Sequence, residues 1–281
     1  MRLLKQVGAV ALVAFIGRVG FAAAGGGAVG ALVSGVATAL LALLVYRWVV
    51  RRTERREPVE VARAGAGRGI VRGVLIGVGM FVAVIANIAL FAEYQVTGFG
   101  SVTGAVAIFG LMAAAAVTEE LLFRGVLLRI IEERGGTWLA LGVTGVAFGL
   151  IHLFNENASL WGAIAIAISA GLMLAAAYVA TRSLWVPIGL HFGWNFAAGG
   201  IFSAVVSGNG VSEGLLETTA SGPALITGGT FGPEASLYTI LAGALLTVGF
   251  LWLAHRRGHL VSRRRGDLAS RRRREVLVTA G

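Results

Sequence analysis

The stretch AAAAVTEELLFRGVLLRIIEERGG, Ala113–Gly136, begins as the apolar sequence of a membrane-spanning helix and then places two glutamates side by side. These are Glu119 and Glu120, and Arg124 follows four residues after the second one. An ionisable side chain near the bilayer centre costs about 2.5–3.5 kcal/mol or more, so such residues are rare and usually functional. The stretch therefore predicts a helical membrane protein that carries a polar site within its helices.

The composition agrees with a membrane-spanning fold. Of the 281 residues, 57% are hydrophobic and only 14% are charged, and long apolar runs recur along the whole chain. The 42 glycines suit helices that approach each other closely within lipid, where small residues let backbones come together. The chain has no cysteine, which excludes disulfides, a thiolate metal site and a cysteine nucleophile.

Windows of about 20 apolar residues mark the membrane-spanning segments. We predict an all-α fold, a polytopic transmembrane helical bundle of about eight spans, of which the first is the weakest. The predicted spans are 6–23, 28–46, 73–91, 101–123, 137–154, 160–180, 184–205 and 236–254. The Gly- and Thr-rich segment 206–235 has no strong helical period, so we expect a linker there rather than a cap over the bundle.

Arginine and lysine lie on one side of this predicted topology. They occur in 1–5, 47–72 and 124–134, at Arg182 and in the tail after His255, whereas the alternate connections 24–27, 92–100, 155–159 and 206–235 have none. The positive-inside rule then places both termini in the cytoplasm. Because the net charge of +10 is spread between apolar runs, we expect anionic lipids rather than nucleic acid as its partner.

Helical spacing sorts the polar residues of the fourth span. Residues four apart share one face of a helix, whereas residues five apart are rotated by about 140°. Glu120 and Arg124 therefore form a predicted charge pair that fixes the helix, while Glu119 points elsewhere without a partner on its own helix. Asn87 in the third span has no companion, and we expect it to form an interhelical hydrogen bond.

Two other spans carry a polar pair at the same spacing, Phe148 with His152 and His191 with Asn195. The turn at RGGT lies about midway between Glu119 and His152, so an antiparallel hairpin with a rise of about 1.5 Å per residue brings them to one level. We expect a cavity between the fourth, fifth and seventh spans that opens toward the cytoplasmic side.

Three motifs occur in order on these apolar helices. EELLFR fits E-E-x-x-x-R, FGLIH fits F-x-x-x-H, and HFGWN fits H-x-x-x-N. On these motifs, the segment from about Ser101 to Phe202 resembles the CPBP intramembrane proteases, the group that contains the CAAX prenyl endopeptidases and bacterial Abi proteins. The resemblance implies an endopeptidase in which Glu119 is the general base and His152 its partner on the water. It also implies that His191 and Asn195 stabilise the oxyanion.

The residues themselves allow the same chemistry. A carboxylate in an apolar cavity can act as a base, and His and Asn donors on one helix face can meet developing negative charge. Glu119, His152 and His191 could instead bind a divalent metal such as zinc, as a His₂Glu set with an open fourth position. Both mechanisms stay open, with a slight preference for direct glutamate catalysis. We interpret the remaining motif residues as structural or supporting: Glu120, Arg124 and Phe148.

These features divide the chain into four parts: 1–100, about three transmembrane helices with a basic cytoplasmic loop; 101–205, a CPBP-type protease core; 206–254, the outer loop and last helix; and 255–281, a basic cytoplasmic tail. We expect an integral protein of a bacterial plasma membrane that hydrolyses a membrane-associated peptide or protein. The alternatives are a non-enzymatic scaffold, a bacteriocin-immunity protein or a transporter with the same polar cavity. No inverted repeat favours transport. Asp267 is the only aspartate, which excludes a two-aspartate protease.

Overall fold

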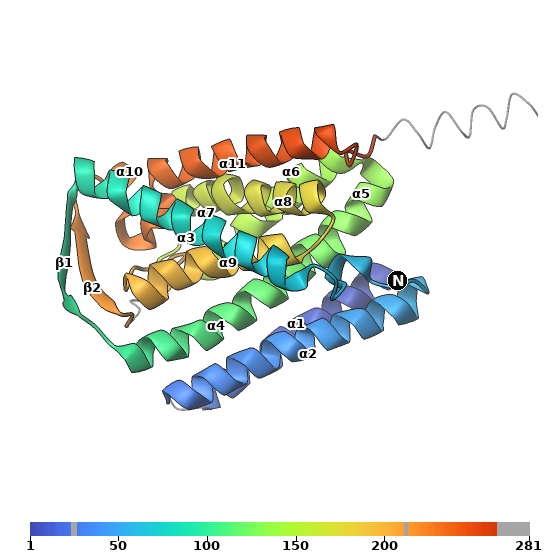
Figure 1. Cartoon of the computed structure of the whole chain (residues 1–281), viewed down its shortest axis with the longest axis horizontal. Helices are drawn as coiled ribbons and strands as arrows, with labels where there is room; N and C mark the ends of the chain where they lie inside the picture. The colour runs from blue at the N-terminus through green and yellow to red at the C-terminus, as the bar shows by residue number, and fades with distance from the viewer. Residues whose placement is uncertain (24–26, 211–212, 263–281) are drawn as a thin grey trace, which may run out of the picture.

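The computed structural model describes residues 1–23, 27–210 and 213–262, and within them the chain is a helical bundle (Figure 1). The α-helices are α1 Arg2–Ala23, α2 Ala28–Glu54, α3 Ala66–Phe91, α4 Val102–Glu120, α5 Arg129–Gly135, α6 Thr137–Ile151, α7 Leu160–Ile166, α8 Met173–Thr181, α9 Trp185–Asn195, α10 Ala224–Thr227 and α11 Leu237–Arg256. Short 3₁₀ turns are η1 Val59–Val61, η3 His152–Phe154, η6 Gly229–Phe231 and η7 Pro233–Ala235. The predicted all-α bundle is confirmed.

Three π-helical segments join α-helices into longer units. They are η2 Leu121–Leu128 between α4 and α5, η4 Ala167–Leu172 between α7 and α8, and η5 Phe196–Ile201 after α9. The first of them makes one helix of 34 residues, Val102–Gly135, with the two glutamates near its middle. Segment η2 overlaps the first motif and η5 directly follows the third, and π-helical turns often occur at functional sites.

Seven helices of the described residues are long and apolar enough to cross a membrane. The predicted span 184–205 corresponds to the 11 residues of α9 and the 6 residues of η5, which together fall just short of that length. At about 1.5 Å per residue they extend roughly 25 Å, somewhat less than the hydrocarbon core of a bilayer. The chain is an integral membrane protein, and its eighth crossing stays a prediction.

Glycines bring α9 into close contact with α3 in the centre of the bundle. A Cβ atom built on Gly73 would lie 2.3 Å from the carbonyl oxygen of Val186, and one on Gly189 would lie 2.3 Å from that of Ile70. No other residue fits at such contacts, because the backbones themselves touch. This packing fixes α9, the helix of the third motif, against the scaffold.

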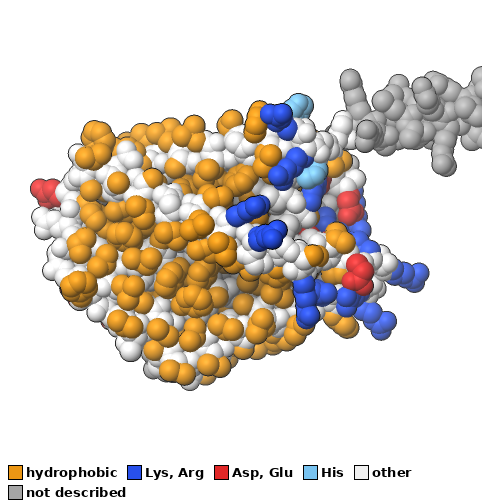
Figure 2. Space-filling view, viewed as in Figure 1, with side chains coloured by type: hydrophobic (Ala, Val, Ile, Leu, Met, Phe, Trp, Pro, Cys, Tyr) orange, Lys and Arg blue, Asp and Glu red, His pale blue; other side chains and the backbone are white. Residues whose placement is uncertain are grey.

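The two ends of the bundle differ in charge. The Lys and Arg side chains gather at one end of the molecule, while hydrophobic side chains cover the surface between the ends (Figure 2). The opposite end carries an antiparallel ribbon of β1 Glu93–Phe99 and β2 Leu216–Ser221, in which Glu93 pairs with Ser221 (Figure 1). The one-sided distribution of basic residues inferred from the sequence is therefore present in three dimensions.

Two expectations are wrong in the regions around the motif helices. Segment 206–235 is not a linker, because it forms β2, α10 and two 3₁₀ turns and buries Phe231 and Glu234 against the bundle. The indole Nε1 of Trp161 donates to the carbonyl of Ala235 at 2.8 Å. Asn87 makes no interhelical bond within the described part of the chain, and its exposed amide donates instead to Ala83 O of its own helix at 2.8 Å.

Candidate active site

Glu120 and Arg124 form the charge pair that their spacing predicts. The guanidinium Nη1 lies 2.8 Å from Glu120 Oε1, and both side chains are fully buried. Arg124 Nη2 also donates to the carbonyl of Gly171 at 2.9 Å and to that of Ala170 at 3.2 Å, both in the π-helix η4. The pair therefore ties the first motif to the neighbouring helix as well as to its own.

His191 lies between the two glutamates. Its Nδ1 is 2.9 Å from Glu120 Oε1, and its Nε2 is 3.9 Å from Glu119 Oε2. Sequence reasoning missed the contact with Glu120, since the two residues are 71 positions apart and spacing along one helix carries no information about a neighbour. Glu120 thus joins the first motif to the third.

The second motif enters through the end of α6. His152 Nδ1 lies 2.6 Å from the carbonyl oxygen of Phe148, one helical turn earlier. The buried Phe148 ring is 4.9 Å from the His152 ring and 6.0 Å from the His191 ring, and the Arg124 guanidinium lies 4.5 Å from its centre. The Phe148 ring therefore packs against residues of all three motifs, which agrees with the structural role expected for it.

A small cavity lies between the second and third motifs. It measures about 30 Å³ and is bordered by His152, His191 and Asn195, together with Ser207 and Glu234 of the loop that follows η5. A water molecule needs roughly 10–15 Å³ by this measure, so the space suits about two waters. Ser207 and Glu234 reach this cavity from the loop at the end opposite the basic one, and the expected opening toward the basic end stays a prediction. Glu119 is not among its lining residues.

Several polar atoms of the site have no hydrogen-bond partner within the described residues. They include the buried carboxylate oxygens Glu119 Oε2 and Glu120 Oε2 and the buried Arg124 Nε. The Glu119 side chain is 34% exposed, so one of its oxygens is buried beside His191 while the rest of the group is accessible. Because buried polar groups are normally paired, these atoms mark the part of the site whose hydrogen bonding is least complete.

The proposed metal ligands do not form a set in this conformation. Among the described residues, no group of three His, Asp or Glu side chains lies close enough to hold a metal ion. Glu119 and His191 approach each other, but no ion pair joins Glu119 to His152 in the part of the chain that the structure describes. The geometry as it stands does not fit a His₂Glu site.

Glu234 is a candidate site residue that sequence reasoning missed. It lies in η7 and is only 6% exposed, although it comes from a loop in which a glutamate is expected to be solvated. Burial raises the pKa of this carboxyl group, whereas a hydrogen bond from Ser207 and the nearby His152 ring act in the opposite direction. No local pattern marks it, because its burial depends on the fold of the whole loop.

Comparison with known proteins agrees with the motif geometry. Residues 101–197 match the family model described as "Type II CAAX prenyl endopeptidase Rce1-like". This match supports the assignment of the segment to the CPBP family. The chain is also similar to the Bacillus subtilis (strain 168) protein named "Putative membrane peptidase YdiL", with 26% identity over 178 residues, which cover 58% of this chain and 67% of that protein. No solved structure matches the chain.

The CPBP segment contains all three motifs and the helices that carry them, from α4 to α9. It indicates a membrane peptidase of the CAAX type in general terms. The parts outside it are α1 to α3 and everything after Ala197, including the loop that contributes Ser207 and Glu234 to the cavity. Those two residues are therefore features of this chain that the family match does not describe.

Proposed function

We propose that this protein is an intramembrane endopeptidase in which Glu119 activates a water molecule for attack on a peptide carbonyl. The observation that carries the proposal is the buried, unpaired Oε2 of Glu119, 3.9 Å from His191 Nε2. A carboxylate beside an imidazole can bind a single water between them and accept its proton during attack. His152 is the second group that anchors this water when substrate is bound.

The tetrahedral intermediate needs donors for its negative oxygen. Asn195 is 6% exposed, borders the cavity, and its amide has no partner among the described residues, so its N–H groups are available. As an imidazolium, His191 donates from both ring nitrogens, one to Glu120 and the other toward the oxyanion. Collapse of the intermediate breaks the C–N bond, and the proton taken up from water is returned to the leaving amine.

Glu120, Arg124 and Phe148 support this arrangement without touching the reacting atoms. Glu120 accepts from Arg124 and from His191 Nδ1, which holds the His191 ring with Nε2 directed toward Glu119. A fixed ring orientation determines which nitrogen is available for chemistry. Removal of Glu120 should therefore affect both the charge pair and the orientation of His191.

The decisive experiment compares the membrane peptides of cells that produce wild-type protein with those of cells that produce Glu119→Gln. The glutamine keeps the size of the side chain but is not a base, so peptides released by the wild type should disappear. Glu217→Gln, an exposed glutamate on β2, is the matched control and should leave the profile unchanged. An unchanged profile in a folded Glu119→Gln protein would refute the enzyme and favour a scaffold or transporter.

Direct glutamate catalysis makes a separate prediction about metal. We expect turnover to survive dialysis against a chelator, since the proposal routes no step through a metal ion. An essential metal would instead give loss of turnover on chelation and recovery on re-addition, with one ion bound per chain. Metal content measured on the same samples distinguishes the two mechanisms.

We further propose that the basic end of the bundle faces the cytoplasm, where its arginines contact anionic lipids. The clustering of Lys and Arg at that end supports this orientation (Figure 2). Because the chain has no cysteine, single introduced cysteines report cleanly on sidedness. Thr97→Cys on β1 should react with an impermeant reagent in intact cells, and Arg63→Cys in the loop after η1 should react only after permeabilisation. The reverse pattern would invert the topology.

A further inference from the structure

Glu234 receives one hydrogen bond on each of its carboxylate oxygens. The indole Nε1 of Trp194 donates to Oε1 at 3.0 Å, and the backbone N–H of Ser207 donates to Oε2. Trp194 lies on α9 directly before the site residue Asn195, and Ser207 lies in the loop that follows η5. Within the described residues, no Lys or Arg pairs with this carboxylate, and both of its donors are neutral.

The same loop is bonded to the end of the second motif. Asn155 Nδ2 donates to the carbonyl of Ser207 at 2.6 Å, and the Asn155 backbone N–H donates to the carbonyl of His152 at 3.2 Å. A second hydrogen bond joins the same two segments, from the backbone N–H of Asn157 to the carbonyl of Gly208 at 2.8 Å. A continuous polar chain thus leads from His152 through Asn155, Ser207 and Glu234 to Trp194.

The type of residue at position 234 follows from these contacts. Two N–H donors converge on one side chain, and a carboxylate offers an acceptor oxygen to each, whereas a glutamine offers one oxygen and one NH₂ group. Burying a carboxylate without a cationic partner is costly, so a glutamate in the cavity wall that is held only by two neutral donors points to a role beyond filling space. Both His152 and Asn195 border the cavity that Glu234 also lines.

We propose that Glu234 is a positioning residue of the active site, which clamps the end of α6 to α9 and so fixes His152 relative to Asn195. The clamp contacts neither Glu119 nor the attacking water, and it acts through Trp194 and Ser207. What the positioned groups do rests on the endopeptidase function proposed above. The clamp itself concerns only the position of His152, which can be measured without a substrate.

The test without substrate follows the ring signals of His152 by NMR in detergent micelles. The chain has four histidines, so histidine-labelled protein gives a simple spectrum, and His152→Asn assigns the signal. In Glu234→Gln the His152 signals should split into several conformers, because one N–H donor faces an NH₂ group. A shift without splitting reports only the loss of the charge near His152 and counts against the clamp. The control Glu217→Gln should give the wild-type spectrum. Unchanged His152 signals in a folded Glu234→Gln protein overturn the clamp.

The test with substrate uses a peptide identified by the membrane-peptide comparison. Displacement of a reacting group by about 1 Å can cost roughly 100-fold in rate, so Glu234→Gln should lower kcat by about 10- to 100-fold with little change in KM. Trp194→Phe removes one donor, and in the double variant Trp194→Phe/Glu234→Gln the remaining Ser207 N–H finds the remaining amide oxygen. The double variant should therefore lose less than the sum of the two single losses.

The two arms separate the possible failures. Simple additivity of the two single losses, with all proteins folded, overturns the clamp because the residues then act independently. Splitting of the His152 signals in Glu234→Gln supports the clamp even where wild-type protein cleaves nothing, and that combination refutes the endopeptidase instead. Thermal unfolding in detergent verifies that each variant is folded before either arm is interpreted.

Discussion

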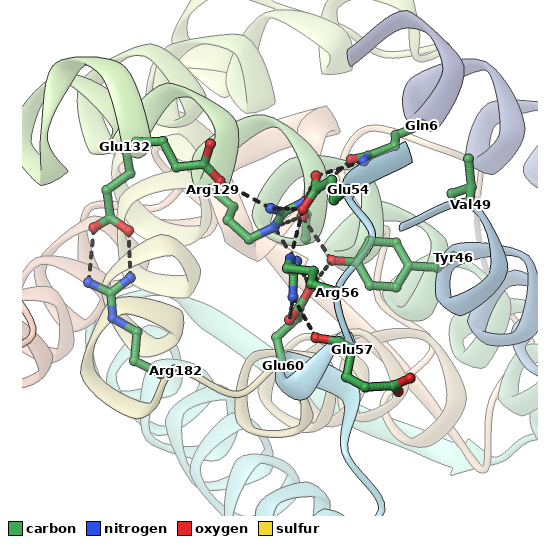
Figure 3. Close-up of polar contacts among 12 residues, drawn as sticks. Gln6, Tyr46, Val49, Glu54, Arg56, Glu57, Glu60, Arg129, Glu132 and Arg182 are labelled. Atoms are coloured by element: carbon green, nitrogen blue, oxygen red, sulfur yellow. Dashed lines mark hydrogen bonds and ion pairs between the residues drawn. The ribbon is translucent and has the colours of Figure 1, made fainter. Parts of the chain in front are cut away.

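Two buried polar clusters each include residues of the long helix Val102–Gly135, and they differ in how completely their atoms are paired. The first, here called the paired cluster, consists of Gln6, Tyr46, Glu54, Arg56, Glu60 and Arg129 near the basic end (Figure 3). Arg129 binds Glu54 with two bonds of 2.6 and 2.7 Å, and Arg56 binds Glu60 with two bonds of 2.7 and 2.9 Å. Every carboxylate oxygen of Glu54 and Glu60 has a partner.

The second cluster, formed by Glu119, Glu120, Arg124 and His191, has three buried atoms without a hydrogen-bond partner among the described residues. Both clusters place buried ion pairs on or beside a membrane-spanning helix, where unpaired charge is expensive. Complete pairing leaves nothing for a ligand to bind, so the paired cluster is structural. Incomplete pairing leaves acceptors for water and substrate, so the second cluster is where chemistry is expected. Burial and charge alone would not distinguish them.

The strongest challenge to this comparison is Arg124→Ala, because Arg124 belongs to the site but acts as a structural residue. Loss of one partner of a buried pair costs about 3–5 kcal/mol, since the other charge is left uncompensated. We expect both folded yield in detergent and turnover to fall. Size-exclusion profiles and cleavage rates per folded molecule measure the two effects. Normal yield with abolished turnover would instead assign Arg124 to the chemistry.

Arg129→Ala tests whether the paired cluster has a purely structural role. This side chain bridges Glu54 and also donates from Nε to the Gly125 carbonyl at 3.0 Å. Its removal should destabilise the fold by about 3–5 kcal/mol, while turnover per folded molecule stays at the wild-type level. The exposed Arg63 in the loop after η1 provides the control, and Arg63→Ala should leave the unfolding transition unchanged. A specific loss of turnover in Arg129→Ala would show that the paired cluster takes part in catalysis.

Asn195→Ala is expected to lower turnover while leaving the stability of the fold unchanged, the inverse of the result expected for Arg129→Ala. Loss of one oxyanion donor typically lowers turnover by about 10²–10³-fold, and the amide has no partner whose loss would destabilise the described fold. Steady-state cleavage and thermal unfolding, measured on one preparation, separate these effects. A large drop in stability with only a slight loss of turnover would move Asn195 from the site to the scaffold.

Sequence reasoning predicted the contacts that lie within one helix and missed those between helices. The spacing of Glu120 and Arg124 gave their pairing, and that of Phe148 and His152 placed both at the site. The bond between His191 and Glu120 depends on how α9 packs against other helices, and glycine contacts with α3 on both sides of His191, at Gly189 and Gly193, help to set that packing. Residue spacing along the sequence carries no information about how separate helices pack.

The π-helical segments and the loop after η5 were unpredictable for a related reason. The Gly125 carbonyl lies within η2 and accepts from Tyr46 OH of α2 at 2.9 Å as well as from the Arg129 side chain, so side-chain donors compete with the regular helical bond. Segment 206–235 has the composition of an exposed connection, yet it buries Glu234 because Trp194 and Ser207 supply its donors. The composition of the segment therefore did not predict the burial of Glu234, because its hydrogen-bond donors come from distant parts of the chain.

The smallest expected effect concerns the acid stability of the paired cluster, through Glu60 in η1. Burial works to raise the pKa of this carboxyl group, but hydrogen bonds from Arg56 and Tyr46 outweigh it and leave the pKa below its ordinary value. Because the folded pKa is depressed, the stabilisation is present above the unfolded pKa of about 4.3 and is lost as the pH falls through the folded value. Hydrogen bonds to a charged group contribute about 1.5–3 kcal/mol.

Glu60→Gln should therefore lower stability at neutral pH and flatten the loss of stability seen on acidification below about pH 5. Unfolding midpoints in detergent between pH 7 and pH 3 provide the measurement. The matched control is Glu57→Gln, three residues away, where an exposed carboxylate pairs with Arg51 at 2.7 Å and solvent screens the interaction. If Glu60→Gln kept the acid dependence of the wild type while Glu57→Gln lost it, the buried pairs would not be what holds this end of the bundle together.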